Sequence, residues 1–327
     1  MDGIMKRKPM KKLLLVLVSV VIIFALAISV MIALPPPKSL PTLEAIAAPF
    51  RNVDFSKIPE LHHYTTRDGS KLAYREYPNQ DIKQIVVLVH GSSGSSLSMH
   101  PLAEYLQRQG MKVYSLDIRG HGNSDRKGDI DYIGQLEDDM EDFANQVLKQ
   151  NETTLVGFSL GGGFVLRFAA STRQKLFGRY ILLSPYIGYN SPTVKLKSGG
   201  WADTSYSRII GISLLGPVGR KMFGHLPVIT YAIDPKTAKY QVAQYSFNLL
   251  TNLSPHSNYK ADIASVKQRL TVLVGEKDEL FNAHAFEPLF TKSRPGTKVI
   301  VVPDVGHITL TTSLSGISAI AKAIAQE

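Results

Sequence analysis

A serine between two closely spaced glycines is the residue in this sequence best placed to do chemistry. Ser159 lies at the centre of the stretch Gly157 to Gly161. This stretch follows a short apolar run at 154–156 and opens into a helix-like segment, a context that predicts a strand-to-helix turn carrying a nucleophile. The glycines let the backbone close tightly, so the serine hydroxyl is presented alone at the tip of the turn. We therefore predict that Ser159 is a nucleophile.

A serine hydroxyl is a poor nucleophile unless a base takes its proton and a third group orients that base. Asp278 comes just after an apolar run that predicts a strand, and His307 lies in the loop after the last such run. The chain order nucleophile, acid, histidine is that of one hydrolase architecture. Glu276 is the nearest alternative to Asp278, whereas Asp304 is expected to cap a helix. The sequence thus predicts a triad of Ser159, Asp278 and His307.

The glycine-rich loop at 90–94 supplies a third element of such a site. It follows a buried apolar run, where a backbone N–H can point at the reacting carbonyl and stabilise its developing negative charge. We expect the N–H groups of Ser92 and Leu160 to form this oxyanion hole. His90 could also be read as the base, but we interpret it, like His121, as part of the scaffold.

Apolar runs that alternate with helix-like segments show how these residues are positioned. The pattern predicts a mostly parallel, doubly wound α/β sheet, which begins with a hairpin at Asp68-Gly69 and includes a helix with apolar spacing from Ile133 to Val147. Ligands bind such sheets at the carboxyl ends of the strands. The predicted buried strands are 85–89, 111–117, 154–156, 180–183, 270–274 and 298–302.

Residues 189–265 interrupt this alternation and contain no clear strand. We interpret them as a helical cap inserted into the core, which is formed by residues 56–188 and 266–327. The segment carries eight lysines and arginines against three aspartates. This charge is either a solvated surface or a face that meets anionic lipid head groups or an anionic substrate.

The N-terminus has the composition of a membrane segment. Residues 1–12 are basic, and the 22 residues from Leu13 to Leu34 are apolar apart from two serines, which is long enough to span a bilayer as a helix. The candidate cleavage site at Ala45-Ile46-Ala47 lies well beyond this run, so we predict an uncleaved signal anchor rather than a cleaved signal peptide. Residues 35–55 then form a linker. The basic flank places the catalytic domain outside the cytoplasm, in the periplasm or on the cell surface if the source is bacterial.

Composition narrows the functional classes. The 327 residues contain no cysteine, which excludes disulfides, thiolate zinc sites and a cysteine nucleophile. The net charge of +10 includes the basic N-terminus, and the rest forms no long basic run, so no nucleic-acid partner is expected. No cofactor or metal is implied, and the oligomeric state is left open.

The motifs together resemble the serine α/β-hydrolase superfamily, in the branch of monoacylglycerol lipases and lysophospholipases. The resemblance covers about residues 60–327 and includes the turn from Asp117 to Ser124, with Arg119 inside it. It implies an α/β-hydrolase fold and the same triad and oxyanion donors. The chain departs from monoacylglycerol lipases at Phe158, where they usually have histidine, and at Leu160, where methionine is common.

The sequence therefore predicts a membrane-anchored serine hydrolase that cleaves carboxylic esters, with a lipid-like substrate such as a monoacylglycerol or lysophospholipid. The alternatives are a non-catalytic binding module with the same fold, or other serine-dependent chemistry such as carbon–carbon bond hydrolysis, acyl transfer or perhydrolysis. A serine nucleophile disfavours dehalogenase and epoxide hydrolase chemistry.

Overall fold

An eight-stranded sheet forms the centre of the protein. The computed structural model describes residues 7–35, 38, 40–51, 53–80, 82, 84–148, 153–195, 200–233 and 241–326. In this sheet, only the two pairings made by the strand Lys71–Tyr77 are antiparallel, which confirms the mostly parallel sheet expected from the apolar runs. In spatial order the strands are β1 (Leu61–Thr65), β2 (Lys71–Tyr77), β4 (Met111–Asp117), β3 (Gln84–Val89), β5 (Thr153–Phe158), β6 (Arg179–Leu183), β10 (Arg269–Gly275) and β11 (Lys298–Val302).

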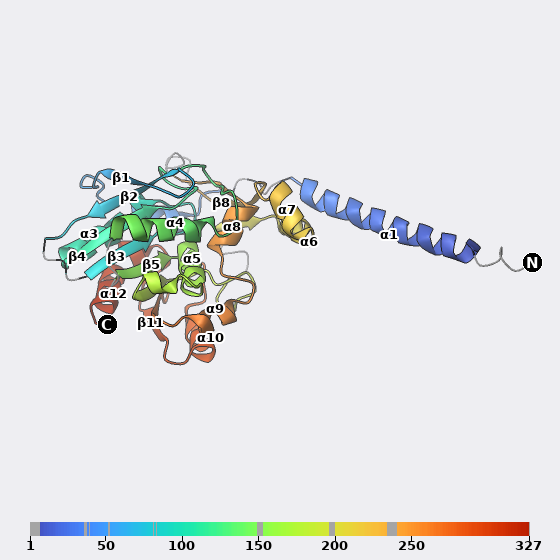
Figure 1. Cartoon of the computed structure of the whole chain (residues 1–327). Coiled ribbons are helices and arrows are strands. Elements are labelled where there is room, and N and C mark those ends of the chain that lie inside the picture. The colour runs from blue at the N-terminus through green and yellow to red at the C-terminus, as the bar shows by residue number, and fades with distance from the viewer. Residues whose placement is uncertain are drawn as a thin grey trace, which may run out of the picture.

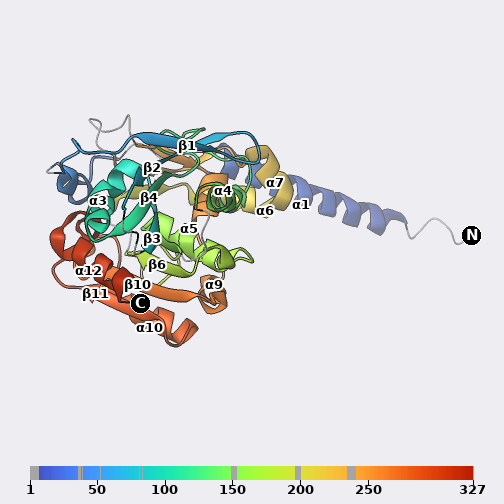
Figure 2. The same cartoon turned by 60° about the vertical axis from the view of Figure 1, so that its left-hand side comes forward.

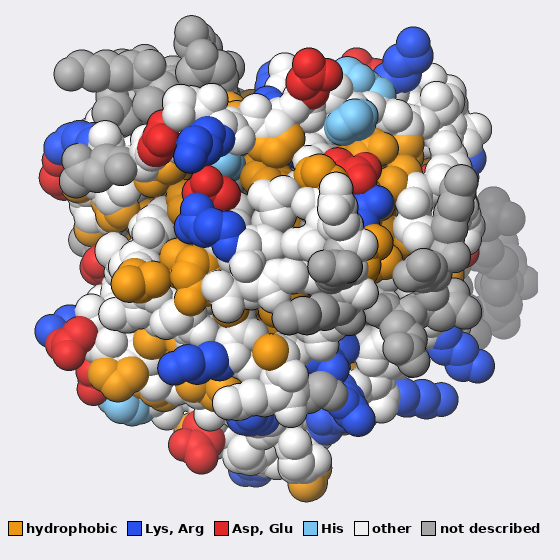
Figure 3. Space-filling view, turned by 90° about the vertical axis from the view of Figure 1, so that its left-hand side faces the viewer, with side chains coloured by type: hydrophobic (Ala, Val, Ile, Leu, Met, Phe, Trp, Pro, Cys, Tyr) orange, Lys and Arg blue, Asp and Glu red, His pale blue; other side chains and the backbone are white. Residues whose placement is uncertain are grey.

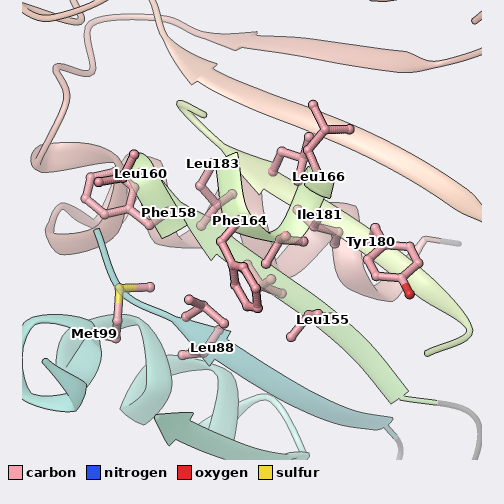
Figure 4. Close-up of a cluster of buried hydrophobic side chains, with 14 of the residues drawn as sticks. Leu88, Met99, Leu155, Phe158, Leu160, Phe164, Leu166, Tyr180, Ile181 and Leu183 are labelled. Atoms are coloured by element: carbon pink, nitrogen blue, oxygen red, sulfur yellow. The ribbon is translucent and has the colours of Figure 1, made fainter. Parts of the chain in front are cut away.

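Helices cover both faces of this sheet (Figure 2). Residues in the middle of the sheet are apolar on both faces because helices bury both, as is usual for parallel strands. Phe164, for example, points from the helix Leu160–Ala169 toward Leu88 and Leu155 on two neighbouring strands (Figure 4). The helices α3 (His100–Arg108) and α12 (Leu314–Ala325) contact each other on one side, and α4 (Gln135–Phe143), α5 (Leu160–Ala169) and α9 (Tyr259–Ser265) lie on the other.

The helix expected from Ile133 to Val147 is shorter than its sequence indicates, and its acidic face is less exposed to solvent. It begins at Gln135 after Gly134, whose φ of 113° ends the preceding turn, and it finishes in a π-helical turn at Ala144–Leu148. Its acidic residues are largely buried, since arginines from neighbouring segments pair with them. Two of these pairs are Glu137 with Arg167 at 2.6 Å and Asp139 with Arg119 at 2.7 Å.

The cap between β6 and β10 contains a small sheet that the sequence analysis did not foresee. Its strands β7 (Ala202–Thr204), β8 (Pro227–Tyr231) and β9 (Gln244–Ser246) pair antiparallel. Strands of three to five residues are too short to give a clear alternating pattern. The helices of the cap are α6 (Tyr206–Leu214), α7 (Gly216–Phe223) and α8 (Phe247–Leu253), followed by α9.

One of the basic residues predicted for the surface of the cap is buried. Arg208 is buried, with 5% of its area exposed, and is held by backbone carbonyls. Four of the charged residues counted in the cap, Lys197, Asp234, Lys236 and Lys239, lie outside the described residues.

At the N-terminus, helix α1 (Arg7–Ala33) projects from the domain beside α6 and α7 (Figure 1). Its segment Met10–Ala33 has a mean hydropathy of 3.2 and is almost entirely exposed, so by length and composition it could cross a membrane. The predicted linker is partly structured, because it contains α2 (Glu44–Ala47) and a short turn of 3₁₀-helix at Ala48–Phe50. Ile46 of α2 packs into the main hydrophobic core, so this part of the linker lies on the domain.

Candidate active site

Ser159 occupies a sharp turn between β5 and α5. Its backbone has φ 55° and ψ −120°, a sparsely populated conformation for a residue with a side chain and typical of strain held at a functional site. A Cβ atom on Gly161 would lie 2.1 Å from the carbonyl oxygen of His90, and one on Gly157 would lie 2.5 Å from the carbonyl oxygen of Gly161. Both glycines are therefore required by close backbone approach, which is the reason proposed from the sequence.

The structure brings the three predicted triad residues together at the carboxyl ends of the strands. His307 Nε2 lies 3.0 Å from Ser159 Oγ, and His307 Nδ1 lies 2.8 Å from Asp278 Oδ2. All three side chains are buried. Because an ionised carboxylate can only accept hydrogen bonds, Nδ1 carries the proton of a neutral imidazole and Nε2 is left to accept the serine proton.

Asp278 is held in its charged form. The backbone N–H groups of Leu280 and Phe281 each donate to its Oδ1 at 2.9 Å. Burial alone would raise the pKa of this carboxyl, but the nearby His307 imidazole and the hydrogen bond from the Phe281 N–H lower the pKa below its ordinary value. The predicted triad acid is thus a carboxylate with three hydrogen bonds among the described residues.

Two aromatic rings pack against the imidazole of His307. The ring centroid of Phe158 lies 4.8 Å from that of His307, and Phe281 packs edge-on with its ring centroid at 5.3 Å. Phe158 is the position where the resemblance to monoacylglycerol lipases would place a histidine, and in this chain it packs against the predicted base, His307.

The loop with the predicted oxyanion donor lies directly against the nucleophile. A Cβ on Gly91 would be 3.0 Å from Ser159 Cβ, so the backbone of this loop is in contact with the turn that carries Ser159. Among the described residues, neither the N–H of Ser92 nor that of Leu160 has a hydrogen-bond acceptor. Both N–H groups are therefore without an acceptor in the described structure, as the predicted oxyanion role requires.

Two residues of the cap, missed by the sequence analysis, hold this loop. Trp201 Nε1–H donates to Ser92 Oγ at 2.8 Å, and the Tyr245 hydroxyl oxygen accepts from the N–H of Ser93 at 2.5 Å. The Tyr245 O–H in turn donates to Nε2 of His121 at 2.5 Å, as a neutral imidazole allows. Burial keeps the pKa of His121 well below its ordinary value. Trp201 could have drawn attention as the single tryptophan, but nothing in the sequence around Tyr245 points to this role.

Trp201→Phe is expected to lower kcat up to about tenfold, because one hydrogen bond to the oxyanion loop is lost while the aromatic packing on Tyr231 is kept. Steady-state kinetics on a soluble ester would measure this, and KM should change less than kcat. Tyr189→Phe, at an exposed ring, is the matched control. An unchanged kcat in Trp201→Phe would mean that the indole does not position Ser92.

The rival residues lie outside this arrangement. Glu276 is exposed and accepts a hydrogen bond from the N–H of Asp304 at 3.3 Å. Asp304 does not cap a helix as expected, because the next helix, α11 (Thr309–Thr312), begins five residues later. The carboxylate of Asp304 instead pairs with Lys277 at 2.6 Å. His90 is buried, and its Nδ1 is engaged with the carbonyl oxygen of Gly91 at 2.8 Å.

No group of three or more His, Asp or Glu residues that could hold a metal ion occurs in the described part of the chain.

Comparison with known proteins identifies the family to which the chain belongs. The family model described as "Serine aminopeptidase, S33" matches residues 80–311, about two thirds of the chain. A monoacylglycerol lipase from Mycolicibacterium smegmatis is 32% identical over 116 residues, which are 33% of this chain and 41% of that protein. A monoglyceride lipase from Rattus norvegicus is 28% identical over 148 residues, or 42% of this chain and 46% of that protein. The chain thus matches less than half the length of either relative.

A solved structure extends the similarity to nearly the whole fold. The crystal structure of a soluble variant of monoglyceride lipase from Saccharomyces cerevisiae superposes with a TM-score of 0.63 at 17% identity, covering 89% of this chain and 97% of that one. At this identity the likeness concerns the fold. With the family match over residues 80–311, it shows that this chain belongs to the serine α/β-hydrolases of the S33 family.

Proposed function

We propose that the protein is a membrane-anchored serine hydrolase that cleaves carboxylic esters through an acyl-enzyme on Ser159. The observation that carries this proposal is the continuous hydrogen-bonded chain from Ser159 Oγ through His307 to Asp278, beside two N–H groups that have no acceptor among the described residues. A binding module of the same fold has no need for a base within reach of a serine hydroxyl or for a strained backbone that presents it.

The reaction follows from this arrangement. Ser159 Oγ attacks the acyl carbonyl while His307 Nε2 accepts the hydroxyl proton, and Asp278 stabilises the imidazolium that forms. The N–H groups of Ser92 and Leu160 stabilise the tetrahedral oxyanion. Collapse of this intermediate expels the alcohol, which takes the proton from His307. Water then attacks the acyl-enzyme while His307 accepts its proton. Collapse of this second intermediate releases the carboxylic acid, and His307 returns the proton to Ser159 Oγ.

The proposed substrate is a lipid-like ester such as a monoacylglycerol or a lysophospholipid. Support comes from two of the matched relatives, which are named as a monoacylglycerol lipase and a monoglyceride lipase. Helix α1, if it spans a bilayer, holds the site near the membrane where such esters are found. A panel of p-nitrophenyl esters from acetate to palmitate, together with monoacylglycerols and lysophospholipids, tests this proposal. We expect hydrolysis of several members, and failure on all of them would contradict esterase activity.

Topology gives a separate prediction. The basic residues that precede the apolar run at Leu13 should stay in the cytoplasm, so the folded domain should be accessible from outside. We expect a protease added to intact cells or spheroplasts to digest the domain and to leave a cytoplasmic marker protein intact. Full protection of the domain until the membrane is permeabilised would contradict this orientation.

A further inference from the structure

The cap carries an exposed apolar face next to α1. On α6, Tyr206, Ile210 and Leu214 recur every fourth residue, so they lie on one side of the helix. Val218 and Met222 have the same spacing on α7. These five side chains, here called the α6–α7 apolar face, are between 49% and 64% exposed, which is unusual for large apolar residues gathered on two adjacent helices.

Helix α1 does not leave the domain as a loose tether, because its last turns pack on α6. Ile28 and Ile32 of α1 are buried together with Ile212 of α6 in a hydrophobic cluster separate from the main core. The two helices approach closely at Gly211, where a Cβ would lie 2.9 Å from Ile32 Cγ1 and 3.2 Å from Met31 Cβ. A side chain at that position would push the helices apart.

Arg208 fastens the same junction. It lies on α6 and donates through Nε to the carbonyl oxygen of Ile32 at 3.0 Å and through Nη2 to that of Leu34. Its Nη1 donates to the carbonyl oxygen of Pro227 at 2.7 Å, at the start of β8. The last carbonyls of a helix have no partner within the helix and carry its partial negative charge, so a buried guanidinium there stabilises the end of α1. The end of α1 and the cap are therefore one unit.

This junction fixes the depth of the cap relative to a bilayer that contains α1. The apolar run ends at Leu34, and Ile28 lies six residues earlier, which corresponds to about 9 Å along the helix axis. A helix that packs on α1 between these residues lies at the depth that interfacial amphipathic helices occupy, about 5–10 Å into the boundary between head groups and acyl chains. The face of α6 that points away from the protein at this depth would meet lipid.

We infer that the α6–α7 apolar face lies in the head-group interface on the extracytoplasmic side of the bilayer that contains α1. Together with α1 it forms one continuous lipid-contacting surface. This inference rests on the proposed membrane anchor. Figures 1 and 2 both place α6 and α7 beside the end of α1. The exposed Arg220 and Lys221 in the last turn of α7 are placed to meet anionic head groups at the rim of this surface. At the opposite end of the molecule, in contrast, apolar side chains are interspersed with charged ones (Figure 3).

The absence of cysteine allows a direct test with single labels. Ile210→Cys and Val218→Cys place a label on the α6–α7 apolar face, and Val30→Cys places one on the exposed side of α1. Leu314→Cys is the control, because Leu314 is an exposed apolar residue, at 69% against 49% for Ile210 and 61% for Val218, on α12 at the end of the molecule opposite α1. Each full-length variant is labelled with an environment-sensitive fluorophore, reconstituted into nanodiscs of phosphatidylcholine and phosphatidylglycerol, and titrated with iodide as an aqueous quencher.

We expect labels at 210 and 218 to be blue-shifted and several-fold less sensitive to iodide than the label at 314, and to approach the behaviour of the label at 30. If the labels at 210 and 218 are quenched like the label at 314 while the label at 30 is shielded, α1 is anchored and the inference is wrong. If the label at 30 is also quenched, the anchor itself is contradicted, so the two failures are distinguishable.

Discussion

Ser159→Ala should lower kcat/KM for ester hydrolysis by about 10⁴-fold or more, because the variant has no atom that can form the acyl-enzyme. The side chain is small and buried, and its backbone conformation is set by the turn between β5 and α5, so the fold should persist. Steady-state kinetics measures the loss, and circular dichroism with thermal unfolding checks the fold.

Ser318→Ala is the matched control for this variant, since Ser318 is half-buried on α12 and its hydroxyl, among the described residues, donates to the carbonyl of Ser315 on the same helix. It should keep full activity. Residual activity of Ser159→Ala within about tenfold of the parent would show that another group does the chemistry.

The second large effect is expected at Asp278. Asp278→Asn should lower kcat about 10³- to 10⁴-fold, because an amide N–H₂ facing Nδ1 favours the imidazole tautomer with the proton on Nε2, which cannot accept the serine proton. KM should change much less than kcat, since the acid does not touch the substrate in the proposed mechanism.

Glu276→Gln is the informative control for Asp278. It removes a carboxylate two residues away, on the same loop after β10, but from an exposed side chain outside the hydrogen-bonded chain. Activity should be unchanged. A large loss in Glu276→Gln with little loss in Asp278→Asn would reverse the two assignments and contradict the account of the acid.

The parts of the fold that could be predicted from the sequence are those with local signals. Continuous apolar runs identify the strands on either side of Ser159, and Gly157 and Gly161 identify the turn because the backbone there leaves no room for a Cβ. The order of Ser159, Asp278 and His307 could be read directly, since each follows a predicted strand whose carboxyl end lies at the same edge of the sheet.

The remaining features depend on contacts between residues far apart in the chain. Trp201 and Ser92 are 109 residues apart, and Arg208 and Ile32 are 176 residues apart, so no local pattern connects them. Arg208 looks like a surface charge in the sequence, because its sequence neighbours give no sign that the end of α1 covers it. Asp139 similarly looks like part of a polar helix face until Arg119 is placed opposite it.

The central claim is that Ser159 becomes covalently acylated, and reaction with a fluorophosphonate probe tests it most directly. The probe phosphonylates a serine only where a base activates the hydroxyl and an oxyanion hole holds the phosphonyl oxygen. After labelling of the full-length protein in membranes and digestion, mass spectrometry should find the adduct on the peptide that contains Ser159, and the adduct should be absent from Ser159→Ala. The account would be contradicted if the folded wild-type protein remains unlabelled, or if Ser159→Ala is labelled to the same extent.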